Sequence, residues 1–62
     1  MMRDIRLKIA RLERGRQQTD VAAMVGMSES RFAKIEQRRV TPPLDVQEQI
    51  AAAVGKQRWE VV

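Results

Sequence analysis

The sequence predicts an all-α fold, a compact bundle of four to five short helices. Every segment between turn residues carries apolar side chains at helical spacing, and none alternates apolar and polar residues as a half-buried strand would. Gly15, Gly26 and Gly55 each follow such a segment, where glycine is favoured because it adopts the left-handed backbone that ends many helices. Residues 41–43, Thr-Pro-Pro, break the chain once more, because proline lacks an N–H donor and restricts the residue before it.

The first two helices are expected over residues 3–14 and 18–25. In the second, Val21, Ala22 and Val25 lie at positions i, i+1 and i+4 of the helix. This spacing places them on one face, so that face can be buried against the rest of the chain.

A third helix is expected after Ser28, with Phe32 and Ile35 pointing inward. Ser28 is a favourable N-cap because its hydroxyl can accept an otherwise unpaired backbone N–H. A fourth helix is expected over residues 44–54, and residues 57–62 are long enough for one helical turn or a short extended arm.

The composition argues against an enzyme. The chain has 62 residues, which suffices for one small domain, residues 1–62. It contains no histidine and no cysteine, the commonest general base and the commonest soft metal ligand. We therefore predict no catalytic site, no metal site and no cofactor. No apolar run approaches the ~20 residues of a membrane span and the first residues carry no secretory signal, so we expect a cytoplasmic protein without membrane contact.

The charges are unevenly distributed along a chain of net charge +4. Residues 1–16 hold six basic and two acidic side chains, residues 28–41 hold four basic and two acidic, and residues 42–55 hold two acidic ones only. A polyanion such as nucleic acid would be met by the first two of these segments. The same pattern also fits an ordinary solvated surface of mixed charge, and charge alone favours that interpretation.

Residues 18–37 are the most informative segment, because two short helices joined through residues 26–28 make a helix-turn-helix. Gly26 permits the sharp reversal, and the small Ala22 lets the second helix cross closely over the first. Such a crossing leaves the N-terminal half of the second helix protruding, a convex shape that fits the major groove of DNA.

Over residues 5–55 the chain resembles the phage repressor and Cro-like (XRE-type) helix-turn-helix family. The residues that match the family pattern without a gap are Arg11, Gly15, Gln18, Val21, Ala22, Gly26, Met27, Ser28, Phe32, Glu36, Pro42, Leu44, Ile50 and Gly55. The resemblance implies a lambda repressor-like fold and binding of double-stranded DNA. It also implies an internal ion pair between Arg11 and Glu36, with a structural role, because the loss of one partner would strand a poorly solvated charge.

Carried over residue by residue, the resemblance implies two sets of DNA contacts. The residues implied to face base edges are Ser28, Glu29, Ser30, Arg31 and Lys34. The residues implied to hold the phosphate backbone are Gln17, Gln18, Arg38 and Arg39. Gln18, at the start of the first motif helix, is also implied to brace a base-reading side chain.

Several of these residues have a purely structural interpretation as well. Glu29 could serve only to stabilise the start of the helix through its favourable interaction with the helix dipole, and Ser28 is mainly a cap. Arg31 suits a phosphate as well as a base. Lys34 could be a solvated surface lysine, although its position one turn inside a protruding helix favours a DNA contact.

The chain departs from the family pattern at three positions. Gln17 stands where the family has a threonine cap, so a weaker cap is expected there. Arg38 replaces a glycine, so this turn either avoids a positive φ or tolerates some strain. Gln47 replaces an apolar residue in the fourth helix.

The first helix carries more apolar side chains than the family core needs. Leu7 and Ala10 match buried positions of the family. The surplus lies on another face, at Ile5, Ile9 and Leu12. Either a second subunit covers this stripe or the C-terminal tail does, with Trp59, Val61 and Val62 as candidates. Trp59 is expected to fill the core of this small domain rather than to anchor a dimer.

Two functions are consistent with these observations. The first is a sequence-specific transcriptional regulator, a repressor that binds a pseudo-palindromic operator as a homodimer. The alternative is an antitoxin-like interaction module that neutralises a partner protein, such as a toxin, and autoregulates its operon.

Overall fold

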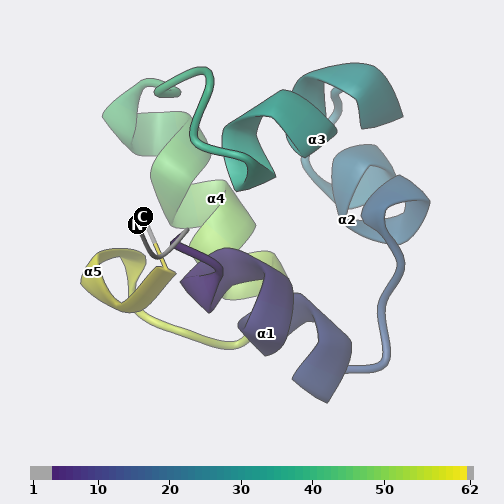
Figure 1. Ribbon diagram of the computed structural model, residues 1–62, viewed down its shortest axis with the longest axis vertical. Coiled ribbons are helices and arrows are strands. Elements are labelled where there is room, and N and C mark those ends of the chain that lie inside the picture. The colour runs from purple at the N-terminus through teal and green to yellow at the C-terminus, as the bar shows by residue number, and fades with distance from the viewer. Residues whose placement is uncertain (1–3, 62) are drawn as a thin grey trace.

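The computed structural model describes residues 4–61 of the chain, which form five α-helices and no strand (Figure 1). In chain order the helices are α1 (Arg6–Glu13), α2 (Gln18–Met24), α3 (Glu29–Glu36), α4 (Leu44–Ala53) and α5 (Arg58–Val61). The all-helical prediction is therefore confirmed, and the tail forms a helical turn rather than an extended arm. The first helix begins at Arg6 rather than at residue 3 as expected, because Asp4 and Ile5 precede its first turn in a non-helical conformation. Arg3 and Val62 lie outside the described residues. None of the five helices combines the length and the apolar character that crossing a bilayer requires.

The helices end where the glycine positions predict. Gly15, Gly26 and Gly55 have φ angles of 68°, 72° and 70°, in the left-handed region that glycine adopts without strain. Arg38 has a φ of 63°, so the turn after α3 tolerates a strain of ~1–2 kcal/mol where the family has glycine. The bonds that its side chain makes, described below, offset this cost.

Side chains close the starts of the two motif helices. The Ser28 hydroxyl accepts the backbone N–H of Arg31 at 3.1 Å, which confirms Ser28 as the N-cap of α3. At the start of α2, the Asp20 carboxylate accepts the backbone N–H of Gln17 at 2.8 Å. The Asp20 side chain, one turn into the helix, thus satisfies a backbone N–H at the N-cap, where Gln17 replaces the threonine of the family.

The polar Gln47 has a structural role in α4. Its side-chain amide donates to the carbonyl of Pro42 at 2.8 Å, and Pro42 is itself buried. The bond satisfies a carbonyl oxygen in the non-helical segment before α4, which explains why a polar residue is accepted at this position.

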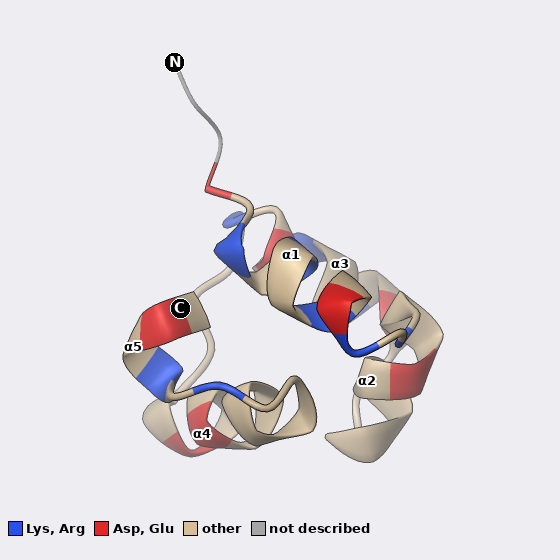
Figure 2. Cartoon of the chain, turned by 90° about the horizontal axis from the view of Figure 1, so that it is seen from below, with Lys and Arg blue, Asp and Glu red and all other residues tan. Residues whose placement is uncertain are grey.

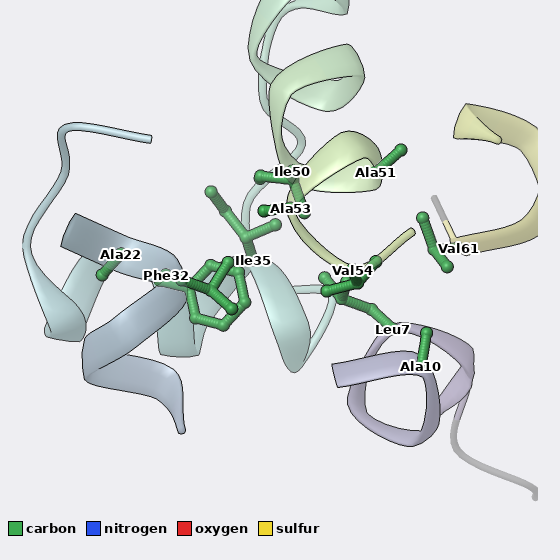
Figure 3. Close-up of a cluster of buried hydrophobic side chains, with 11 residues drawn as sticks. Leu7, Ala10, Ala22, Phe32, Ile35, Ile50, Ala51, Ala53, Val54 and Val61 are labelled. Atoms are coloured by element: carbon green, nitrogen blue, oxygen red, sulfur yellow. The ribbon is translucent and has the colours of Figure 1, made fainter. Parts of the chain in front are cut away.

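All five helices contribute to one hydrophobic core (Figure 3). The buried residues are Leu7, Ala10, Val21, Ala22, Phe32, Ile35, Ile50, Ala51, Ala53, Val54 and Val61. Phe32 of α3 is the largest of the fully buried side chains. Both helices of the motif are therefore anchored by their apolar sides, and their polar sides are left to solvent.

Trp59 does not fill the core, contrary to the expectation from the sequence. Its side chain is 66% exposed, whereas Val61 is 1% exposed. Because α5 is a single turn, residues two apart point to nearly opposite sides of it. Burial of Val61 therefore directs Trp59 to the surface.

A polar network joins the start of α1 to α5. The Asp4 carboxylate accepts a hydrogen bond from Nη2 of Arg6 at 3.0 Å and forms an ion pair with Nη2 of Arg38 at 3.2 Å. Arg38 also donates to the carbonyl of Val61. Arg6 reaches the carbonyl of Trp59 at 3.4 Å. The hydrogen bonds from Arg6, and then the charge of Arg38, hold the pKa of Asp4 well below its usual value of 3.8.

This network predicts a loss of stability in acid. Because the folded chain lowers the pKa of Asp4, the carboxylate stabilises the fold above its usual pKa of 3.8, and this contribution is lost as the pH falls below that value. We expect the wild type to melt at a higher temperature than Asp4→Asn. The difference between the two melting temperatures should be largest above about pH 5 and should shrink at lower pH. Asp45→Asn, at an exposed acidic residue of α4, is the control for general effects of charge. A wild-type-to-Asp4→Asn difference that stayed constant down to about pH 2 would contradict the role given to Asp4.

Candidate nucleic-acid interface

α2 and α3 form the predicted helix-turn-helix. Ala22 and Phe32, one from each helix, are 2% and 0% exposed in the shared core. The inward side of α3 consists of Phe32, Ile35 and Glu36, all buried. The rest of α3 is therefore free to face a ligand.

The five residues predicted to face base edges are all exposed. They are Ser28, Glu29, Ser30, Arg31 and Lys34. With 3.6 residues per turn, Ser30 and Lys34 fall on the side of α3 that points away from Phe32. Arg31, three residues before Lys34, is its neighbour on the helix surface, so two cations and the Ser30 hydroxyl are available to a ligand on this part of α3.

A buried ion pair fixes α3 to α1. Nε of Arg11 lies 2.8 Å from Oε2 of Glu36, and the two side chains are 8% and 6% exposed. Nη1 of Arg11 donates to the carbonyl of Arg16 at 2.9 Å. Nε2 of Gln18 donates to Oε1 of Glu36 at 3.0 Å. The predicted internal pair is confirmed, and it also holds Gln18, the half-buried first residue of α2.

A hollow of about 340 Å³ lies beside this ion pair. Its lining includes Gln18 and two residues that the sequence-based site left out, Lys8 and Gln37. Lys8 precedes Arg11 by three residues and Gln37 follows Lys34 by three. Residues three apart are neighbours on a helix surface, so this spacing is the signal that could have identified both.

Unpaired cations lie on one part of the chain. Within residues 4–61, the Lys and Arg side chains that make no ion pair are Lys8, Arg14, Arg16, Arg31, Lys34 and Arg39. They belong to α1, its connection to α2, α3 and the segment after α3, whereas the charged residues of α4 are Asp45 and Glu48. Arg14 is the exception in space, because its guanidinium packs against Gly55 after α4. Figure 2 shows the contrast between the basic residues on α1 and its connection to α2 and the acidic residues on α4. The field of the described chain therefore attracts a polyanion to the helix-turn-helix side.

Arg38 lies differently from the other residues expected to contact phosphate. Its side chain is 27% exposed, pairs with Asp4 and donates to the carbonyl of Val61. An arginine committed to two internal acceptors has few donors left for a phosphate, so we remove Arg38 from the proposed contact set. Arg39 and Gln17 are exposed and stay in that set.

A family model described as a helix-turn-helix domain matches residues 5–61. The chain belongs to this family. Its fold is similar to that of a hypothetical transcription factor, NHTF, from Neisseria, with a TM-score of 0.80 and 23% identity over 94% of this chain and 72% of that one. No curated protein sequence matches the chain. The family and the fold together support a DNA-binding regulator as the general function.

The buried ion pair predicts a specific pattern of stability changes. Glu36→Leu leaves Arg11 buried without its counter-ion, and Arg11→Met does the same to Glu36. We expect each to lower the free energy of unfolding by ~3–5 kcal/mol, enough to unfold much of a small domain. The double variant removes both charges and should recover most of that loss. Urea unfolding followed by circular dichroism measures all four proteins, and additive losses in the double variant would contradict this account.

Proposed function

We propose that the protein is a sequence-specific regulator that binds double-stranded DNA through α3 and represses transcription by occupying its operator. The observation that carries the proposal is the outer side of α3, where Ser30, Arg31 and Lys34 are exposed on a helix held in place by its own buried side. An α-helix fits the major groove, where each base pair presents a distinct pattern of donors and acceptors.

The proposed contacts divide into base reading and phosphate holding. Lys34 lies in the last turn of α3, on its outer side, where an ammonium group can reach O6 or N7 of a guanine. Glu29, in the first turn, can accept a hydrogen bond from N4 of a cytosine. Arg39, Gln17 and Gln18 lie at the ends of the motif helices, where the nearest DNA groups are phosphates. The new candidate Lys8 adds a cation next to Gln18.

We propose further that the operator is pseudo-palindromic and that a homodimer binds it. One recognition helix makes too few base contacts for useful specificity alone. In proteins with this motif the two helices enter the groove about one helical turn apart, ~34 Å.

The alternative is an antitoxin-like module that neutralises a partner protein and autoregulates its operon. The apolar side chains left on the outer side of α1 favour it, since Ile9 and Leu12 are 47% and 55% exposed. Purification of the native protein with an unrelated chain bound would support this alternative.

Selection of bound sites from a random pool of DNA duplexes tests the proposed function. We expect enrichment of a short sequence that recurs as an inverted repeat. A pool in which no sequence is enriched, at low as well as moderate salt, would overturn the proposal, because non-specific phosphate contacts alone do not select a sequence.

Two single substitutions separate base reading from phosphate holding. Lys34→Ala should weaken binding to the selected site by ~1–3 kcal/mol and relax discrimination at one base pair of each half-site. Arg39→Ala should weaken binding to all sequences about equally and lower the salt slope by ~1 per lost phosphate contact. The measurement is a titration of each variant against the selected and a scrambled duplex at several salt concentrations.

Arg58→Ala provides a matched control, because Arg58 pairs with Glu48 of α4 at 3.4 Å and lies on α5, away from the motif. It should leave both the affinity and the sequence preference unchanged. If Lys34→Ala weakened both duplexes alike while Arg39→Ala altered the sequence preference, α3 would be docked differently from our proposal.

A further inference from the structure

The outer side of α1 is apolar and remains uncovered within the described chain. Ile9 and Leu12 are 47% and 55% exposed, whereas Ile5, 44% exposed, lines the hollow beside α3. The described part of the tail, up to Val61, does not cover them, because Val61 turns into the core and Trp59 turns outward with 66% exposure. We infer that a second copy of this chain docks here, on the face formed by α1 and α5 with Ile9 at its centre. This inference rests on the proposed function, because it names the surface that pairs two DNA-bound copies.

A groove between α1 and α5 gives this face its shape. Its floor consists of Ile9, Ala10 and Val61, and its volume is about 200 Å³. Small-molecule sites usually measure ~300–1,000 Å³ and enclose their ligands, so this groove suits one or two protein side chains better.

The charges at the rim of the groove cancel. Arg6 and Lys56 contribute two positive charges, and Glu13 and Glu60 contribute two negative ones. An apolar floor inside a rim without net charge does not attract the negatively charged phosphate backbone of DNA. It matches the composition of a protein–protein contact, in which an apolar centre is surrounded by polar residues.

The order of the charges fits a second copy in particular. Arg6 is the first residue of α1 and Glu13 is the last. In a two-fold dimer the α1 helices of the two copies can lie antiparallel, which sets Arg6 of one copy opposite Glu13 of the other and brings the two Ile9 side chains together near the axis. A two-fold contact uses the same patch on both copies, so a patch must be complementary to itself, as this one is.

The small size of the face predicts weak pairing in solution. Stable complexes bury ~800 Å² on each partner, more than one two-turn helix and a single turn can supply. Two neighbouring half-sites on DNA raise the effective concentration of the copies to the millimolar range, which compensates for this weakness. We therefore expect free protein to pair only at high micromolar concentration and to bind two half-sites cooperatively.

Sedimentation equilibrium over about 1 µM to 1 mM tests the pairing without DNA. Ile9→Glu should weaken self-association at least tenfold, and the milder Ile9→Gln should weaken it less. The matched control is Leu44→Glu, at a leucine that is 63% exposed on α4 and outside the groove. Because Ile9 is half exposed, its variants should fold, which thermal unfolding verifies.

Duplexes that carry one or two copies of the selected half-site test the pairing on DNA. Ile9→Glu should bind the single half-site like the wild type and lose the cooperative gain, ~10-fold or more, on the paired site. A wild type that stays monomeric at 1 mM, or self-association that Leu44→Glu weakens and Ile9→Glu does not, would overturn this inference. Failure of every duplex to bind would instead overturn the proposed function and leave self-association as a separate result.

Discussion

The buried pair of Arg11 and Glu36 is the constraint on which the candidate site depends. Two charges removed from water are expensive unless every donor and acceptor is matched. Here Gln18 and the carbonyl of Arg16 complete the pairing of the two side chains. The pair therefore joins the last turn of α1 to the last turn of α3 and to the first residue of α2. Because α3 is only two turns long, fixing its end against α1 fixes the direction in which its outer side points.

A second polar network stabilises the other end of the chain. A domain of this size buries too little apolar surface to hold a four-residue helix by packing alone. α5 contributes one buried side chain, Val61, and its backbone is held by Arg38 and Arg6 through the carbonyls of Val61 and Trp59. Asp4 links these two arginines. The positive φ of Arg38 is accepted because an arginine, unlike glycine, can make these bonds.

Features that depend on local chemistry or on the family pattern could be predicted from the sequence. Features that depend on which distant residues meet in the folded chain could not. The glycine helix ends, the Ser28 cap and the Arg11–Glu36 pair all belong to the first kind, and the exposure of α3 follows from its apolar spacing. Trp59 belongs to the second kind, because hydrophobicity favoured burial and only the position of a single helical turn decided between it and Val61. Arg38 is similar. Its charge suggested a phosphate contact, and the nearby Asp4, far away in sequence, gives it an internal partner instead.

The proposed DNA contacts and the proposed self-association face lie on different sides of α1. Lys8 and Arg11 point toward the hollow beside α3, whereas Ile9 and Glu13 line the groove beside α5. Substitutions on one side can therefore change the affinity for a half-site without changing how two copies pair, and the reverse holds for the other side. Under the proposed function each half-site is bound through one short helix, so this separation matters. Weak contacts of each kind multiply when both form on the same DNA, so selectivity comes from their combination rather than from a tight interface of either kind.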